Sequence, residues 1–228
     1  MMATAQKGYR GMGMEGPVAR WYEKTTGRDL QPFRETAERL KSCLPNGGSV
    51  LEIAPGPGFL AIELARDPKF RVTGLDISRT FVELARKNAA QAGVSVDFRQ
   101  GNASDMPFAG SSFDLLVCRA AFKNFSEPQK AIEEMRRVLG PGGMGVIIDL
   151  RRDASMNEIK RHVGGMNLGP FSRVFTTQAF RFMLLKRAYT KPELEKMLNQ
   201  SGFETVDVRT DDIGMEAWFS GTTSGFPT

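Results

Sequence analysis

The amino-acid sequence predicts a doubly wound α/β fold, with a seven-stranded, mostly parallel sheet, helices on both of its faces and an additional helical cap. Three observations support this fold class. Short apolar runs alternate with amphipathic segments of helix length, and this alternation is typical of parallel sheets with right-handed crossovers. The run Phe113–Cys118 is almost continuously apolar, as in a strand buried on both faces. A tight glycine loop joins the first strand to a helix.

The predicted elements follow one another in a regular order. The glycine-rich, polar stretch Met1–Gly16 is expected to be mobile, and Pro17–Leu44 is expected to be helical. The expected strands are 50–53, 71–75, 95–98, 113–118, 145–150, 203–208 and 215–220, the last antiparallel to the one before it. The expected helices between them are 59–66, 79–92, 126–139 and 191–201.

The chain divides into four expected parts. Residues 1–44 form an N-terminal helical lid, 45–150 the α/β core that binds the principal ligand, 151–188 an inserted cap over a second ligand, and 189–228 the C-terminal part of the core sheet. The cap is inferred because the strand–helix alternation stops after residue 150. A sequence rich in Phe and Met replaces it, interrupted by Gly164-Gly165 and Gly169-Pro170.

Composition and charge bear on which partners, metals and cellular locations are expected. The chain has 228 residues and a formal charge of +5, from 31 basic and 26 acidic residues scattered along the sequence. Because the basic residues form no tail or arm, no nucleic acid partner is expected. The only cysteines, Cys43 and Cys118, have no metal-binding or disulfide spacing, so we expect no metal and a cytoplasmic location. No segment has the apolar length of a membrane span.

A glycine loop and the acid that ends the next strand are the main candidates for binding a ligand. The strand ending at Glu52 and Ile53 runs into Ala54-Pro55-Gly56-Pro57-Gly58, which opens a helix. Glycines let a ligand approach the backbone, and the free N–H groups of a helix N-terminus attract negative charge. Asp76 ends the next strand, roughly 20 residues after the loop, where a carboxylate accepts hydrogen bonds from both hydroxyl groups of a bound ribose.

A dinucleotide site is the first alternative, because Gly56-x-Gly58-x-x-Ala61 matches the G-x-G-x-x-A pattern of NAD-dependent oxidoreductases. Two features disfavour it. Glu52 would place a carboxylate near a pyrophosphate, and Pro55 and Pro57 lack the N–H groups of a phosphate cradle. A zwitterionic amino-acid tail, which carries an ammonium group, suits both features better.

The same residues resemble a known family. Val50–Phe59 is similar to the first motif of the class I S-adenosylmethionine (SAM)-dependent methyltransferases, with Ala54 where the first glycine usually stands. Residues 101–108, 113–118 and 136–143 resemble three further motifs in the family's order. The resemblance implies a Rossmann-like methyltransferase fold and SAM as cofactor. It implies these cofactor-binding residues: Glu52, Ala54, Gly56, Gly58, Asp76, Ile77, Asn102, Ala103 and Arg119.

Individual roles follow from the resemblance. Asp76 resembles the family's ribose-binding acid. Asn102 stands where the family often has Asp, and its side-chain oxygen would accept from the adenine amine while the Ala103 N–H donates to the ring. A non-catalytic cofactor- or lipid-binding module, with 181–187 as an interfacial helix, is the second alternative.

The acceptor is the least determined part. Residues 120–126 resemble the quinone-biosynthesis C-methyltransferases. Arg119 and Lys123 follow the fourth strand at its carboxyl end, where ligands bind in open sheets, and they are the candidate catalytic residues, with Arg173 joining them from the cap. Together with apolar walls they would hold a small acceptor as its anion. His162 is read as a surface or packing residue. C-, O-, N- or S-methylation, and a monomer or a homodimer, remain open.

Overall fold

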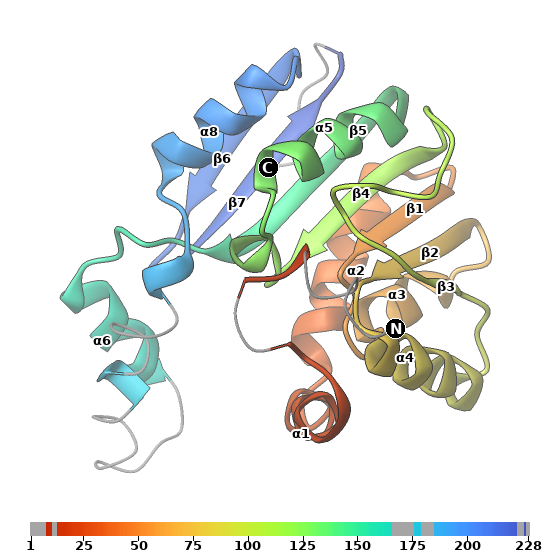
Figure 1. Cartoon of the computed structure of the whole chain (residues 1–228), viewed down its shortest axis with the longest axis horizontal. Helices are drawn as coiled ribbons and strands as arrows, with labels where there is room; N and C mark the ends of the chain where they lie inside the picture. Colours follow the sequence, from red (N-terminus) through yellow and green to blue (C-terminus); the bar gives the residue numbers. More distant parts are fainter. Residues whose placement is uncertain (1–7, 11–12, 166–175, 179–184, 223–225, 227–228) are drawn as a thin grey trace.

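The computed structural model describes residues 8–10, 13–165, 176–178, 185–222 and 226. Within this part of the chain, seven strands form one sheet in the order β3-β2-β1-β4-β5-β7-β6 (Figure 1). The strands are β1 (Gly48–Ile53), β2 (Phe70–Asp76), β3 (Asp97–Gln100), β4 (Phe113–Arg119), β5 (Leu139–Leu150), β6 (Thr205–Thr210) and β7 (Gly214–Ser220). β1 to β5 are parallel, whereas β7 lies antiparallel between β5 and β6.

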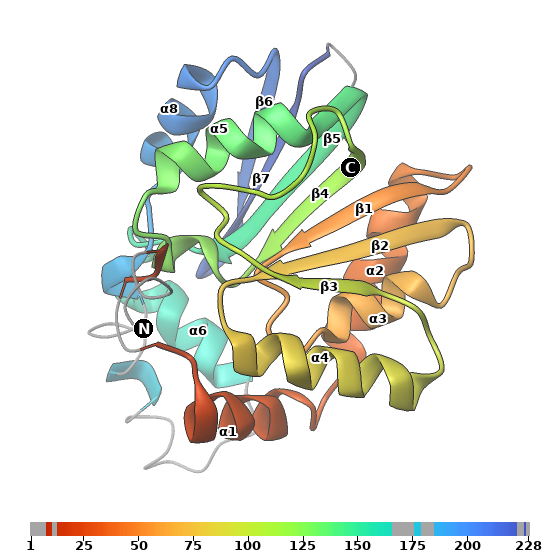
Figure 2. The same cartoon turned by 45° about the vertical axis from the view of Figure 1, so that its right-hand side comes forward.

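Helices cover both faces of the sheet. One face carries α2 (Gln31–Cys43), α3 (Phe59–Ala65) and α4 (Arg79–Ala92), and the other carries α5 (Pro128–Val138) and α8 (Lys191–Gln200) (Figures 1 and 2). Successive residues of β1 point to opposite faces. Accordingly, Val50 packs with Leu60 of α3, while Leu51 belongs to the cluster that includes Ile132 of α5 and Leu194 of α8. The predicted doubly wound fold is confirmed.

Two helices lie beyond the edge at which the parallel strands end: α1 (Gly16–Thr26) and α6 (Met156–Gly165) (Figure 1). Ala19 of α1 is buried against α4, and Val163 of α6 packs with Ile213. Two short 3₁₀ helices also occur, η2 (Phe122–Asn124) after β4 and η4 (Leu185–Arg187) before α8. This carboxyl edge is where ligands bind in open α/β sheets.

Two predicted boundaries are wrong. The helix expected over Pro17–Leu44 is two helices, because the chain turns at Gly27, where a side chain would meet the Glu23 carbonyl oxygen and the Phe59 ring at 3.0 Å. β5 begins at Leu139 and not at residue 145 as expected, so Gly140, Gly142 and Gly143 belong to the strand, next to an irregularity in its pairing with β4. The other predicted elements agree with the structure to within two residues at each end.

The expected division into lid, core and cap is only partly covered by the structure. α2 packs in the core layer through the fully buried Ala37 and Leu40, so that within 1–44 only α1 lies at the carboxyl edge. Arg173, and residues 181–184 of the expected interfacial helix, lie outside the described residues. Closure of a lid and a cap over the site stays a prediction. No helix in the described part combines the length and the apolarity needed to cross a bilayer.

We expect Gly58→Ala to lower the free energy of unfolding by about 3 kcal/mol. Gly58 has a φ of 83°, and a Cβ there would lie 2.7 Å from the Phe98 ring and 2.9 Å from the Ala85 Cβ. Gly93 is the matched control, because its φ is 68° but no atom lies within 4 Å of its Cβ position. Urea unfolding measures both variants, and equal losses would show that the close packing at Gly58 is unimportant.

Candidate cofactor site

The loop after β1 approaches a ligand with its backbone. Ala54, Gly56 and Gly58 have φ values of 57°, 56° and 83°, a left-handed series that turns the chain sharply from the strand into α3. The loop is held by the Ala54 N–H, which donates to the Leu75 oxygen at 2.7 Å, and by the Gly58 N–H, which donates to the Pro55 oxygen at 3.0 Å. The Cβ position of Gly56 has one neighbour within 4 Å, the ring of Tyr22 at 4.0 Å, so this part of the loop is open to a ligand.

Asp76, at the end of β2, is buried and already supports the loop. Its Oδ2 accepts from the Gly56 N–H at 2.9 Å, and its Oδ1 accepts from the Ser78 N–H at 2.8 Å. Burial raises the pKa of Asp76 to about 6, although these two backbone N–H groups lower it. Each carboxylate oxygen can accept a second hydrogen bond. The Asp76 carboxylate can therefore bind a pair of ligand hydroxyl groups while it holds the loop.

Glu52 is the least satisfied polar group in the described residues. Its side chain is 3% exposed, and its Oε2 has no hydrogen-bond partner there. Burial raises the pKa of Glu52 to about 8, opposed by the Ala61 amide and by the charge of Arg119. A buried carboxyl group without a partner costs free energy, which a cationic ligand group would recover. This orphaned oxygen fits the ammonium group of an amino-acid tail.

Arg119 ends β4 near Glu52 and is held from outside the sheet. Its guanidinium group lies 4.5 Å from the centre of the Phe33 ring of α2, a cation–π contact. Phe33 in turn packs edge-to-face on Phe59, the first residue of α3. Arg119 therefore brings a positive charge to the start of α3 beside the Glu52 carboxyl group, which a ligand ammonium group would ionise, so a zwitterionic tail can bind there.

Lys123 is brought to the same edge, but it is not a free cation. Its Nζ donates to Asp149 Oδ1 at 2.7 Å and to the Ala120 oxygen at 2.8 Å, and its backbone N–H donates to Asp149 Oδ2 at 2.9 Å. The two side chains are only 11% and 2% exposed. Asp149 thus anchors η2 to the end of β5, and one of the three Lys123 ammonium hydrogens remains for a ligand.

The predicted adenine side is formed by Ile77, Asn102 and Ala103. Asn102 Oδ1 accepts from the Ser104 N–H at 3.0 Å, so the side chain shapes the turn, and a second lone pair remains for a ligand. Ala103 is half-buried against the core. Gly8 lies directly on this surface, since a Cβ there would be 2.5 Å from Ile77 Cδ1 and 2.9 Å from Asn102 Oδ1.

Residues 8–10 are part of the site that the sequence did not predict. Tyr9 pairs with Phe125 in a short antiparallel bridge, and the Arg10 N–H donates to the Asn124 oxygen at 2.7 Å. Burial raises the pKa of Tyr9, whose hydroxyl group lies within electrostatic reach of Arg187, Asp76 and Tyr22. The expectation of a mobile start did not include these contacts of residues 8–10 with the core. The sequence held no signal for this pairing, because a single residue forms the bridge.

His162 lies in a different place. It lines an open polar crevice between α6 and the turn before β7, together with Arg151, Glu158, Thr210, Asp211 and Asp212. The loop residues, Asp76 and Glu52 are not among the residues of this crevice. The described residues contain no group of three or more His, Cys, Asp or Glu side chains that could hold a metal ion.

Known proteins share both the sequence and the fold. Residues 50–143 match the family described as a methyltransferase domain. The demethylmenaquinone methyltransferase of Thermotoga maritima is 30% identical over 192 residues, which cover 78% of this chain and 79% of that protein. That of Deinococcus radiodurans is 37% identical over 107 residues, 46% of this chain and 44% of the relative. The demethylmenaquinone methyltransferases of Chlorobaculum parvum and Thermus thermophilus are also similar, and this chain spans 66% and 56% of the length of those two relatives.

The fold has a counterpart among solved structures. A protein of Methanococcus maripaludis assigned to the SAM-dependent methyltransferases superposes with a TM-score of 0.71 at 22% identity, covering 95% of this chain and 97% of the other. That likeness concerns the fold, and the sequence match to the Thermotoga maritima relative shows that the chain belongs to the class I SAM-dependent methyltransferases. The predicted family, its likeness to the quinone-biosynthesis group and the predicted cofactor are thereby confirmed.

Proposed function

We propose that this protein transfers the methyl group of SAM to a ring carbon of a small apolar acceptor with an acidic hydroxyl group, of the reduced-quinone class. The cofactor half rests on one observation. The orphaned Oε2 of Glu52 and the buried carboxylate of Asp76 flank a glycine loop that is open to a ligand. The acceptor half is supported by the relatives, which are demethylmenaquinone methyltransferases.

Each residue of the site would contact a different part of the cofactor. Glu52 would bind the ammonium group of the amino-acid tail, and Arg119 its carboxylate. Asp76 would accept hydrogen bonds from the two ribose hydroxyl groups, with Gly56 and Gly58 allowing close backbone approach. Ile77, Asn102 and Ala103 would contact the adenine ring, and Ala54 turns the chain toward the tail. When bound, SAM supplies a methyl group that its sulfonium already activates, so the protein needs to add orientation and water exclusion.

Arg119 by its charge, and Lys123 by the one ammonium hydrogen that Asp149 and Ala120 leave available, would then favour the anionic form of the acceptor. A cation near a phenol lowers the pKa of its hydroxyl group. The phenolate that forms has a higher electron density at the neighbouring ring carbon than the neutral phenol. That carbon supplies the electron pair for the new C–C bond as the bond between sulfur and methyl breaks. The ring then loses the proton of the attacked carbon to solvent and regains aromaticity. Proton transfer after the methyl step does not require a dedicated base.

The proposal also covers the size of the acceptor, the location of the protein and the closure of the site. The acceptor is a small molecule, and the expected cytoplasmic location belongs to this proposal. We also propose that α1 and the segment 151–188 close over the acceptor, which hydrogen exchange with and without S-adenosylhomocysteine (SAH) reports. Binding of labelled SAH in competition with NADH tests the cofactor. Displacement of SAH by NADH at equal concentration would support the oxidoreductase alternative instead.

We expect Lys123→Met to lose most activity on an acidic acceptor while SAH affinity stays unchanged, because the remaining Nζ donor would bind the acceptor and not the cofactor. Removing Lys123 alone leaves Asp149 buried without its cation, which destabilises the fold. The double variant Lys123→Met, Asp149→Asn removes both charges, while an amide oxygen at position 149 can still accept from the backbone N–H of residue 123 and so keep η2 anchored. Steady-state rates of both variants are the measurement.

His162→Ala is the matched control for this prediction, because His162 lines the separate α6 crevice. Its rate is expected to match that of the unmodified protein. If His162→Ala abolished turnover while both Lys123 variants remained active, the assignment of the acceptor side would be wrong.

A further inference from the structure

The outer surface of α1 carries an unusual side chain. Among the described residues, Trp21 is the one large hydrophobic residue that is exposed, at 66%. The other tryptophan of the chain, Trp218, is 1% exposed in the core. Tryptophan is enriched where proteins meet the interface between lipid and water, because its ring is apolar and its N–H is polar.

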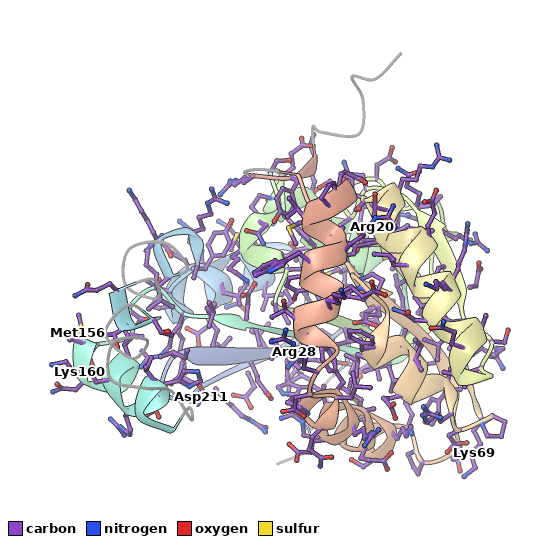
Figure 3. All side chains as sticks on the ribbon, turned by 90° about the horizontal axis from the view of Figure 1, so that it is seen from below. Arg20, Arg28, Lys69, Met156, Lys160 and Asp211 are labelled. Carbon is purple, nitrogen blue, oxygen red and sulfur yellow. The ribbon has the colours of Figure 1, made fainter. Side chains whose placement is uncertain are left out.

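Basic residues surround Trp21. Arg20, Lys24 and Arg28 are exposed and follow one another at intervals of four residues, so they line one side of α1 and continue just past its end. Figure 3 looks onto this edge of the molecule, where α1 crosses the view with Arg20 alongside it and Arg28 near its end. None of the three makes an ion pair with another described residue.

The acidic residues of segment 15–29 are in other surroundings. Glu15 accepts from the backbone N–H groups of Arg79 and Thr80 at 3.0 and 3.1 Å. Asp29 accepts from the Gln31 N–H at 3.0 Å, and Glu23 is half-buried. Segment 15–29 has as many acidic as basic residues, so the positive charge is local: the outer side of α1 presents Trp21 beside Arg20 and Lys24, and the exposed Asp29 offsets part of the charge of Arg28.

The inner side of α1 borders the cofactor site. Tyr22 packs edge-to-face on Phe81 of α4, and its ring lies 4.0 Å from the Cβ position of Gly56 in the loop. A surface that binds the outer side of α1 is therefore held next to the entrance of the site. Figure 3 shows α6 at the same edge, with Lys160 and Met156 on it.

We propose that the outer side of α1, formed by Arg20, Trp21, Lys24 and Arg28, docks on a lipid bilayer with anionic headgroups. Trp21 inserts at the interface, and the three cations bind lipid phosphates. The inference rests on the proposed function in one respect: an apolar acceptor partitions into lipid, so docking places the site where the acceptor is concentrated. Charge complementarity favours a bilayer over a protein partner, which would cover Trp21 without requiring anionic lipid.

The tryptophan itself reports the interaction. Vesicles of phosphatidylcholine, with or without phosphatidylglycerol, are added to the whole protein without SAM or acceptor. We expect a blue shift of the Trp21 fluorescence and co-sedimentation with the anionic vesicles only, both reversed by salt. Trp218 gives the unshifted background, which remains alone in Trp21→Phe.

Charge variants locate the surface. Lys24→Gln is expected to weaken vesicle binding about fivefold, and the additional change Arg20→Gln by a similar factor. Lys69→Gln is the control, because Lys69 is exposed at the opposite edge, just before β2, and its loss should leave binding unchanged. Equal effects of Lys24→Gln and Lys69→Gln, or no Trp21 shift with anionic vesicles, would overturn the proposal.

An activity measurement separates this proposal from the proposed function. Lys24→Gln should turn over a water-soluble acceptor at the normal rate and a vesicle-borne acceptor more slowly. If no acceptor is methylated while vesicle binding still depends on Trp21 and Lys24, the proposed function fails and the docking surface stands. If the vesicle-borne acceptor is methylated equally by both proteins, the docking surface is wrong.

Discussion

Asp76→Ala is expected to weaken the binding of SAH about 100-fold or more. The carboxylate would accept hydrogen bonds from two ribose hydroxyl groups, and each hydrogen bond to a charged group contributes about 1.5–3 kcal/mol. The loop itself also relaxes, because the Gly56 N–H loses its acceptor at 2.9 Å. Isothermal titration calorimetry with SAH measures the loss, and transfer activity should fall with it.

Folding can be separated from binding in this variant. Burial of the Asp76 charge is unfavourable, as its raised pKa of about 6 shows, so its removal offsets part of the two lost backbone contacts. The melting temperature without ligand should therefore stay close to that of the parent protein. Asp97→Ala, which removes an exposed carboxylate paired with Arg99 on the edge strand β3, is the control and should bind SAH normally. A folded Asp76→Ala protein with unchanged SAH affinity would refute the ribose-binding role.

Glu52→Gln is expected to weaken SAH binding at pH 8 by about 10- to 100-fold, the effect of one buried, charge-assisted contact. It should also change the pH dependence. The pKa of Glu52 is about 8 without ligand, and an ammonium group beside it would lower that value. At pH 7 binding therefore releases a proton, so affinity rises between about pH 7 and pH 8 and then levels off. Asp76, with a pKa of about 6, is already ionised over most of this range.

The free energy of unfolding of the unliganded protein should fall over the pH range in which its affinity for SAH rises. Because the folded-state pKa of Glu52 lies above the ordinary value of 4.5, the unliganded protein loses stability as pH rises from 4.5 through about 8. Glu52→Gln removes this loss, so the variant should melt higher than the parent at pH 8 while binding SAH less well. Calorimetry in buffers of different ionisation enthalpy detects the proton. Glu63→Gln is the control, because Glu63 is another buried carboxylate and is paired with Arg66, and this variant should still release the proton on SAH binding. If the parent protein released no proton on SAH binding, the role of Glu52 would be contradicted.

Much of the fold was predictable because hydrophobic periodicity is a local property. The parallel strands and the helix over 79–92 appear where the sequence indicated them, and the structure shows Ser78 as the N-cap and Gly93 as the C-cap of this helix. The break at Gly27 was missed although the sequence carried signals for it, because Gly27 ends α1 and Pro32 stands in the first turn of α2. The close approach of Gly27 to the Phe59 ring of α3 is a tertiary contact that the spacing of apolar residues does not report.

The site was predictable only where a motif joins neighbouring residues. Gly56, Gly58 and Asp76 lie at adjacent strand ends, and their spacing indicated that they would lie together. The hydrogen bond from the Gly56 N–H to Asp76 was not predicted. The partner of Lys123 was missed, because Asp149 comes 26 residues later and reaches it through the pairing of β4 with β5. The isolation of Glu52 Oε2 depends on everything that packs around it, so no sequence pattern reports it.

Methyl transfer itself gives the most direct test of the central claim. The protein is incubated with SAM carrying a labelled methyl group and a reduced, short-chain demethylmenaquinone analogue, and the product is analysed by mass spectrometry and NMR. We predict one labelled methyl group on a ring carbon, one SAH formed for each product molecule, and loss of both in Asp76→Ala but not in Asp97→Ala. A protein that binds SAH yet yields no methylated product, or that places the methyl group on oxygen, would contradict the proposed reaction.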